Sequence, residues 1–249
     1  MQLRLIRNAT LLLEYAGHRL LLDPDFGPKH SRASFTGKSA NPTVDLPLTV
    51  ENILEGLGLV LVSHLHQDHF DEVAAEVLPK NLPLLCQPGD EERIWGKGFT
   101  NVTPVEDSLE WNGIHITRTP GEHGQGAVLD LMGKVSGFVL QAEGEPTLYW
   151  AGDTVLYTAV REIVACYRLQ VIVSHSGGAL WEGYGLILMD AAQTVELCQI
   201  ARQSTVVAVH MEALDHCTVS RAELRQATRK AGIPDTRLLI PTDGEALTL

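Results

Sequence analysis

Three histidines and two aspartates crowd the end of a short apolar run. His64, His66 and Asp68 alternate in the segment LVLVSHLHQDHFD, so an extended chain would direct all three side chains to the same side. His69 follows at the expected turn into a helix, where Asp71 fits the N-cap position. Imidazole nitrogens combined with a carboxylate suit zinc, manganese or iron better than calcium or magnesium alone. The spacing therefore predicts a transition-metal site at this strand end.

Four later apolar runs also end in a residue that can bind a metal. ITRTPGEH ends in His123, TLYWAGD in Asp153, VIVSH in His175 and VVAVH in His210. Strand ends of an open α/β sheet commonly meet at one crevice, so we expect these side chains to converge with the first group. Single residues have plainer explanations: Asp153 could cap a helix that begins after Thr154, and His175 could be structural. The repetition favours one shared metal centre.

The elements that must position these residues form two halves, each with strands first and helices later. Apolar strands open the chain around a turn at Gly17, and the runs SGFVLQA and TLYWAG predict a hairpin in the middle. Later helices are expected to begin at Asp190, paired with Gln193 as a capping box, and at Ser220. This order predicts the α/β class with a four-layer αββα sandwich.

The chain shows no clear domain boundary. Residues 27–49 are rich in Gly, Pro, Ser, Thr and Lys without periodicity, which predicts a long loop that is functional or mobile. No linker separates two units between residues 50 and 249. The sequence therefore predicts a single domain over residues 1–249.

Composition limits the classes of partner. A net charge of −12 disfavours binding to nucleic acid, because that affinity rests on neutralising phosphates. No apolar run reaches the ~20 residues that span a bilayer, and the N-terminus lacks a secretory signal pattern. We expect a cytoplasmic protein that acts on a small molecule, without nucleic acid or membrane partners, and a homo-oligomer is left open. The scattered cysteines predict buried, reduced thiols: Cys86, Cys166, Cys198 and Cys217.

Taken in order, these motifs resemble the metallo-β-lactamase superfamily over nearly the whole chain. TLLLEYAGHRLLLDP is similar to its opening strands, HLHQDH to its HxHxDH signature, AGDT to its metal-bridging segment, and AVH to its last ligand strand. VHMEALDHCTVSRAELRQA is similar to the branch that includes L-ascorbate-6-phosphate lactonase. Two positions depart from the family pattern. The sequence has GEH before the third ligand, where a glycine-histidine pair is usual, and Ser63 where threonine is commoner.

The resemblance implies the αββα fold and a dinuclear metal centre. Zinc is the expected metal, with manganese and iron as alternatives. Two divalent ions lower the pKa of a bridging water, so a metal-bridging hydroxide is the expected nucleophile. The implied ligands are His64, His66 and His123 for one metal, Asp68, His69 and His210 for the other, and Asp153 for the bridge.

The leading functional hypothesis is a dinuclear metal-dependent hydrolase of a small ester or lactone, with an anionic substrate left open. One alternative is a phosphodiesterase on a small phosphodiester, since the same chemistry serves both. Another is a non-catalytic protein whose metals hold a binding surface, although a structural zinc normally has four protein ligands. Asp68 is expected to orient the water or take its proton, and His175 to contact the substrate or protonate a leaving group.

Further polar and aromatic residues have weaker signals. Lys29, His30, Arg32 and Lys38 make the long loop locally basic, which would suit an anionic substrate group, but a solvated loop is the favoured interpretation.

The segment that follows His175 has similar ambiguity. Trp181 and Tyr184 could line a pocket or pack ordinarily. His216, six residues after His210, is either a substrate contact or a local hydrogen-bonding partner, and the second interpretation is favoured.

Overall fold

The first sheet starts with three antiparallel strands. In the computed structural model, which describes residues 1–249, it contains β1 (Gln2–Arg7), β2 (Thr10–Tyr15), β3 (His18–Leu22), β4 (Leu59–Val62), β5 (Leu84–Cys86), β6 (Val102–Pro104) and β16 (Ala246–Thr248). The spatial order is β16–β1–β2–β3–β4–β5–β6. β1 to β3 are antiparallel neighbours, whereas β3 to β6 run parallel. The turn between β2 and β3 places Ala16 and Gly17 at positive φ, as a tight hairpin turn requires.

The second sheet repeats this plan in the later half of the chain. It contains β7 (Ser108–Trp111), β8 (Ile114–Pro120), β9 (Ser136–Gln141), β10 (Leu148–Trp150), β11 (Val171–His175), β14 (Thr205–Val209) and β15 (Leu238–Leu239). The order is β15–β14–β11–β10–β9–β8–β7. β9 and β10 form the predicted hairpin. β10, β11, β14 and β15 are parallel neighbours, which requires the helical connections between them.

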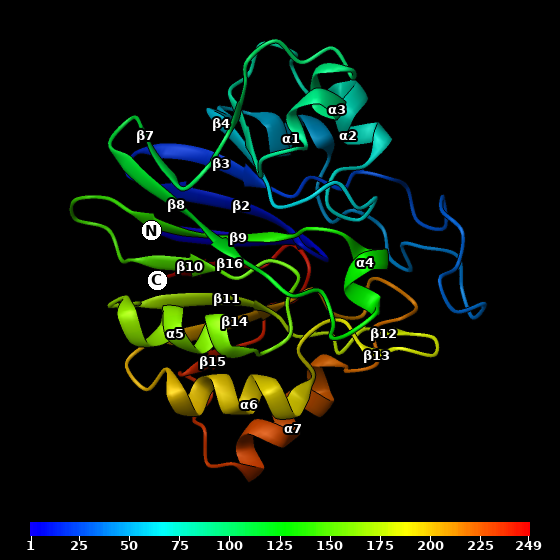
Figure 1. Ribbon diagram of the computed structural model, residues 1–249, viewed down its shortest axis with the longest axis vertical. Coiled ribbons are helices and arrows are strands. Elements are labelled where there is room, and N and C mark those ends of the chain that lie inside the picture. The colour runs from blue at the N-terminus through cyan, green and yellow to red at the C-terminus, as the bar shows by residue number, and fades with distance from the viewer.

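Helices cover the outer face of each sheet, so the predicted αββα sandwich is confirmed. Figure 1 shows one group of helices above the two sheets and another group below them. Apolar side chains of each group join the buried cluster of the sheet that it covers. The first group is α1 (Val50–Leu54), α2 (Glu72–Val77) and α3 (Glu91–Trp95); the second is α5 (Thr158–Cys166), α6 (Ala191–Ile200) and α7 (Arg221–Lys230).

The layer between the two sheets is the largest apolar cluster, with 21 buried residues. Alternate side chains on each strand point into it, for example Leu59 and Leu61 on β4, because the side chains of a strand alternate between its faces. Trp150 and Phe138 stack within this layer with ring centroids 5.8 Å apart. Both sheets are therefore buried on two faces, which explains their nearly continuous apolar strands.

Strand direction brings the predicted ligands to one edge. β8 and β10 each run antiparallel to β9, so they point the same way, and β10, β11 and β14 are parallel. The residues that follow these strands, or end them, therefore emerge at the same edge of the second sheet. This edge faces the end of β4, where the HLHQDH segment begins.

Helix starts agree with the sequence in most cases. Asp71 caps α2 through the N–H of Ala74, and Ser220 begins α7 with a complete capping box. The box predicted at Asp190 is only half formed, because the Gln193 side chain accepts a hydrogen bond from Leu156 N instead. Asp153 does not cap a helix, since α5 begins later, at Thr158.

The thiol prediction is only partly right. All four cysteines are free, and Cys86 and Cys198 are buried. Cys166 is exposed at the end of α5, and Cys217 is half-buried. Cys166 faces the solvent from the last turn of α5, and the spacing of the cysteines in the sequence does not indicate this.

Three segments outside the two large sheets gather beside the ligand edge. They are the long loop at residues 27–49, the short helix α4 (Val128–Met132), and the hairpin of β12 (Leu180–Trp181) and β13 (Gly185–Leu186). Figure 1 shows α4 and this hairpin on the side of the molecule where the blue loop projects. No helix has the length and apolar character needed to cross a membrane.

Candidate metal centre

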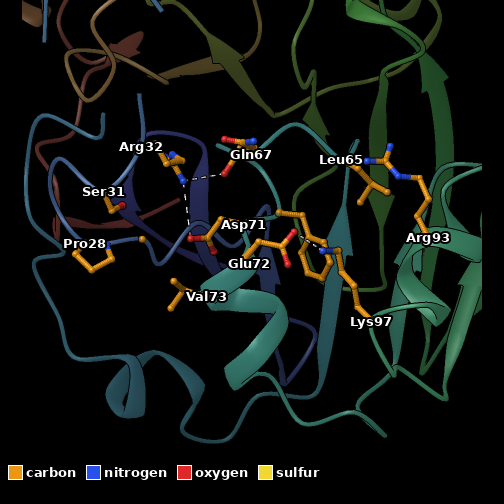
Figure 2. A pocket seen from close by; sticks show the side chains of 12 residues that line it. Pro28, Ser31, Arg32, Leu65, Gln67, Asp71, Glu72, Val73, Arg93 and Lys97 are labelled. Carbon is orange, nitrogen blue, oxygen red and sulfur yellow. Dashed lines mark hydrogen bonds and ion pairs between the residues drawn. The ribbon is translucent and has the colours of Figure 1, made fainter. Parts of the chain in front are cut away.

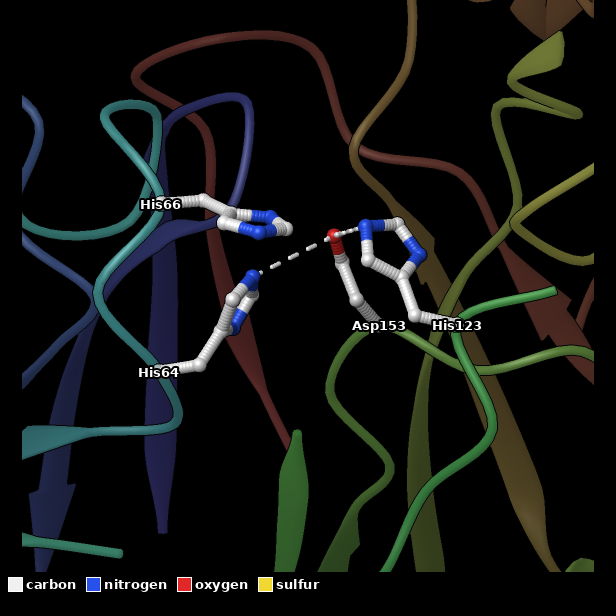
Figure 3. A group of neighbouring side chains, drawn as sticks. All are labelled: His64, His66, His123 and Asp153. Carbon is white, nitrogen blue, oxygen red and sulfur yellow. Dashed lines mark ion pairs between the residues drawn. The ribbon is translucent and has the colours of Figure 1, made fainter. Parts of the chain in front are cut away.

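His64, His66, His123 and Asp153 form the first group of potential metal ligands. Their ligand atoms all lie within 4.8 Å of one another. Figure 3 shows His64 and His66, from the loop after β4, facing His123 and Asp153 from the second sheet. Asp153 Oδ2 lies 3.3 Å from His123 Nε2 and 3.9 Å from His64 Nε2. The group matches the first predicted ligand set together with the predicted bridge.

The second group shares Asp153 and consists of His69, Asp153, His175 and His210, whose ligand atoms also lie within 4.8 Å of one another. Asp153 Oδ2 is 3.1 Å from His69 Nε2, and Oδ1 is 3.7 Å from His210 Nε2. Asp153 is thus the one side chain common to both groups. This group contains His175, which the predicted second ligand set does not.

Asp68 lies at the border of the second group. Its Oδ2 atom is 3.4 Å from His69 Nε2 and 3.1 Å from His210 Nε2. Asn8 Nδ2 also approaches this oxygen at 3.4 Å, and the Asn8 carbonyl accepts a hydrogen bond from His210 N. The structure therefore brings Asp68, His69 and His210 together as predicted, and adds Asn8, a residue without a sequence signal.

Asp23 orients two of the histidines and was missed by the sequence analysis. Its Oδ2 atom accepts hydrogen bonds from His69 Nδ1 and Ser63 Oγ, each at 2.6 Å. Ser63 Oγ in turn accepts from His64 Nδ1 at 2.9 Å. These bonds engage Nδ1 of each ring and leave Nε2 of each ring as the atom that can bind a metal. The available signal was an aspartate closing an apolar strand before Pro24, the pattern of the later ligands.

The free imidazole nitrogens fit a metal. Nε2 of His64 and of His69 are buried without a hydrogen-bond partner, and buried polar atoms are seldom left unpaired. His123 donates from Nδ1 to the carbonyl of Ile187 at 2.8 Å, which turns its Nε2 towards Asp153. Nitrogen and carboxylate donors of this kind are the ordinary ligands of zinc and related ions.

His175 is held away from the solvent. It is fully buried, and its Nδ1 donates to Asp153 Oδ1 at 2.6 Å. Its Nε2 accepts from the indole N–H of Trp150 at 3.3 Å. Both ring nitrogens are therefore engaged, and the contact with Asp153 fixes that carboxylate. Trp150 is a second residue without a sequence signal for this role.

Charge in the centre divides the histidines into two kinds. Burial lowers the pKa of His123 to about 4, and burial with nearby imidazoles holds the pKa of His64 well below its ordinary value. Burial acts in the same direction on His69 and His210, but the carboxylates Asp153 and Asp68 outweigh it. The pKa of His69 lies well above its ordinary value, and that of His210 rises to about 10.

The two carboxylates show the converse effect. Burial alone would raise the pKa of Asp68 and of Asp153, but the adjacent His69 and His210 hold both values well below the ordinary range. Both groups are ionised and available as ligands or proton acceptors near neutral pH. The centre consequently combines two anions with imidazoles that are either neutral or ready to exchange a proton for a metal.

A cavity of about 500 Å³ opens onto these ligands. Its lining includes His66, Asp68, His123 and Asp153 together with a largely apolar wall. That wall comes from the long loop, α4 and the β12–β13 region. Its members are Phe35, Leu131, Met132, Trp181 and Ile187, and His216 from the segment after β14 also lines the cavity.

A neighbouring cavity of about 390 Å³ contains charges that are mostly paired (Figure 2). Arg32 binds both carboxylate oxygens of Asp25, at 2.6 and 2.7 Å, and donates to the Gln67 carbonyl. Lys97 pairs with Glu72 at 2.6 Å. Lys29, His30 and Lys38 are exposed. The basic loop therefore does not assemble a cradle for an anion.

The fold and the site define a metal-dependent hydrolase. A family model described as the beta-lactamase superfamily domain matches residues 18–211. The chain belongs to this superfamily, as the HLHQDH and AGDT motifs predicted. A protein of Bacillus subtilis strain 168, UPF0173 protein YddR, is 37% identical over 254 residues that cover the whole of both chains.

Two solved structures share nearly the whole fold. An isothiocyanate hydrolase from Delia radicum gut bacteria is 35% identical, with a TM-score of 0.95 over 100% of this chain and 99% of the other. A possible metal-dependent hydrolase from Veillonella parvula DSM 2008 is 33% identical, with a TM-score of 0.96 over the same shares. The similarity to the lactonase-like branch stays a prediction.

Proposed function

We propose that this protein is a hydrolase with two divalent cations, expected to be zinc, that attacks an electrophilic carbon of a small molecule. The observation that carries the proposal is the pair of ligand groups that share Asp153, in which Nε2 of His64 and of His69 makes no hydrogen bond, next to a cavity lined by His66, Asp68, His123 and Asp153. The proposed ligands are His64, His66 and His123 for one ion, Asp68, His69 and His210 for the other, and Asp153 between them.

Asp68 and His175 have different roles beside the proposed metals. Bound cations of this kind lower the pKa of a coordinated water and polarise the bond that is attacked. Asp68 is ionised and lines the cavity, so its carboxylate can orient the attacking water and accept its proton. His175 donates to Asp153 Oδ1, which leaves Oδ2 to face both groups.

His175 is a positioning residue in this proposal. Its complete burial and its bond from Trp150 leave neither nitrogen for a leaving group. The hydrogen bond from His175 Nδ1 holds the Asp153 carboxylate in place, and through that carboxylate His175 would affect the binding of both metals. The proposal therefore assigns proton transfer to Asp68 rather than to His175.

The cavity supports attack at carbon in a substrate with little charge. Apart from the ligands, aromatic and aliphatic side chains make most of the lining, which also contains Arg93. A small ester or lactone fits this setting, because its carbonyl can meet the ligands while its apolar part meets the wall. A phosphodiester is less well served, since an apolar wall does not compensate its charge. A purely metal-held binding surface would not need an open cavity at the ligands.

An isothiocyanate is the second candidate substrate. The observation that favours it is the apolar wall, together with full-length similarity to a solved isothiocyanate hydrolase. Water would add its oxygen to the carbon of R–N=C=S, both water protons would end on nitrogen, and the C–N bond would break. The products would be R–NH₂ and carbonyl sulfide. The organic group R would lie against the apolar wall.

Parallel rate measurements distinguish these substrates. Zinc-reconstituted wild type and Asp153→Ala are assayed with a lactone series, an ester series, benzyl isothiocyanate and a phosphodiester series, with protein-free samples as the blank. The proposal expects turnover of one carbon electrophile that falls to the blank rate in Asp153→Ala. Turnover of phosphodiesters alone would show that the attack occurs at phosphorus and that the proposed attack at carbon is wrong. Undiminished activity of Asp153→Ala would refute the assignment of the centre.

A further inference from the structure

His216 is a buried polar side chain in the wall of the ligand cavity. It is 6% exposed, and its Nδ1 atom has no hydrogen-bond partner although it is buried. The ring lies on the same cavity as Asp68, Asp153 and His123. Leaving a buried polar atom unpaired is unfavourable, so such an atom beside a cavity calls for a ligand. The favoured expectation of a local hydrogen-bonding partner is not met by the structure.

Asp215, the residue before His216, holds the Phe35 segment so that the Phe35 ring contacts the His216 imidazole. Asp215 accepts hydrogen bonds from Phe35 N at 3.0 Å, Thr36 Oγ1 at 2.6 Å and Asn41 Nδ2 at 2.8 Å. These bonds fix part of the long loop against the segment of His216. Phe35 then meets the His216 ring edge-on, with centroids 4.7 Å apart. Phe35 is thus anchored although its side chain is 39% exposed.

A second aromatic ring comes from the β12–β13 hairpin. The Leu180 N–H donates to the carbonyl of His216 at 3.1 Å, which ties β12 to the same segment. Trp181 lies 6.4 Å from Phe35 between ring centroids, and both rings line the cavity. Two chain segments, remote in sequence, therefore present aromatic surface beside one unpaired imidazole.

We propose that Phe35, Trp181 and His216 form a substrate subsite for a small molecule with an apolar or aromatic body. The two aromatic rings receive that body, and His216 hydrogen-bonds a nitrogen, oxygen or sulfur atom next to the reacting carbon. The subsite rests on the proposed hydrolase function, because the reacting group must lie at the metal ligands. The subsite selects among substrates by contact with their apolar body, whereas the metal centre acts on their reacting carbon.

Hydroxamates that carry a metal-binding head test the subsite without requiring turnover. Acetohydroxamic and phenylacetohydroxamic acids are titrated into zinc-loaded protein by calorimetry, and zinc is counted by mass spectrometry. Burial of the phenyl group against the two aromatic rings should tighten binding about 10- to 100-fold over the acetyl compound. Phe35→Ala should remove most of this difference. The matched control is Leu180→Ala, an exposed side chain of β12 that does not line the cavity.

Two substitutions of His216 test the proposed hydrogen bond to the ligand. His216→Phe should weaken both hydroxamates about tenfold through the lost hydrogen bond. His216→Gln, which keeps a donor and an acceptor, should recover part of that loss and guards against a folding defect. Zinc content and unfolding temperature should match the wild type in the Phe35 variant.

Failure of the subsite and failure of the hydrolase proposal give different results. Wild-type protein that holds zinc and binds both hydroxamates equally would overturn the subsite alone. Unchanged binding in His216→Phe would remove His216 from it. Wild-type protein that takes up no zinc would overturn the proposed function and, with it, the subsite.

Discussion

At the scale of single residues, the site depends on side chains that do not themselves face the cavity. Asp23 accepts hydrogen bonds from His69 Nδ1 and Ser63 Oγ, and Ser63 Oγ accepts one from His64 Nδ1. One buried carboxylate thus orients two imidazoles from opposite predicted ligand sets. Its own φ of 45° lies in the left-handed region, which residues other than glycine adopt at a cost and often at functional sites.

Replacing Asp23 should therefore weaken metal binding. In Asp23→Asn the amide can accept only through one oxygen, so His64 and His69 lose part of their orientation, and zinc affinity should fall about 10- to 100-fold. Competition with a chromophoric chelator measures the change. Asp45→Asn, at an exposed position, is the matched control. Equal zinc affinity in Asp23→Asn and wild type would show that these hydrogen bonds do not control the orientation of His64 and His69.

The pH dependence of metal uptake follows from the same residues. The pKa of His69 lies well above its ordinary value and that of His210 is about 10, so both imidazoles are protonated in the metal-free protein near neutral pH. Metal binding must release these protons, and affinity should rise with pH by up to about 100-fold per unit. Calorimetry in buffers with different ionisation enthalpies counts the protons. Uptake independent of pH between 6 and 8 would contradict this account.

At the scale of elements, close approach between backbone segments fixes the last ligand. His210 follows β14 with a φ of 59°, and its carbonyl packs against Gly177 in the loop after β11. A Cβ added at Gly177 would lie 2.9 Å from Cys217 Sγ and closer still to the His210 carbonyl oxygen. Glycine is therefore required where these two strand ends meet.

Gly177→Ala should displace the His210 strand end. The overlap is with backbone, which cannot move as a flexible side chain would, so we expect a loss of about 1–3 kcal/mol of stability and weaker zinc binding. Chemical denaturation and zinc titration measure the two effects. The comparison variant is Gly96→Ala, where the nearest contacts are ordinary at 3.4 Å. Equal stability of the two variants would mean that the loop adapts without cost.

The sequence predicted the elements whose apolar runs have a clear period and a clear end. The strands that lead to His64, Asp153, His175 and His210 are recognisable because a polar residue ends or closely follows each apolar run. The short helix α4 and the β12–β13 hairpin were missed, since five residues or fewer carry too little periodicity. Trp181 lines the cavity, which is one of the two interpretations left open for it, whereas its contact with Phe35 depends on tertiary structure alone and has no sequence signal. Asp23 ends an apolar run as the later ligands do, but the role of Trp150 rests on one hydrogen bond and leaves no spacing pattern.

At the scale of the whole molecule, the centre joins two halves of the sandwich. His64, His66, Asp68 and His69 follow a strand of the first sheet, whereas His123, Asp153 and His210 follow strands of the second. A metal bound by both sets links the sheets at one edge of their shared core. That the chain is one domain over residues 1–249 remains a prediction.

Metal removal should accordingly lower global stability. A ligand that binds only the folded state stabilises it by an amount that grows with its concentration over Kd, about 4 kcal/mol at 1,000 times Kd. We expect a chelator to lower the unfolding temperature and zinc to restore it, as followed by calorimetry. The same cycle on Asp153→Ala should give a much smaller shift. A chelator without effect on zinc-loaded wild type would contradict a link between the halves.

The central claim is that Asp153 serves two metal ions at once. The most direct test is the zinc content per chain of purified, reconstituted wild type and Asp153→Ala, measured by inductively coupled plasma mass spectrometry after removal of loose ions. The account predicts two ions in the wild type and the loss of one or both in the variant, with the fold retained by circular dichroism. Two ions retained by Asp153→Ala, or none in the folded wild type, would contradict it.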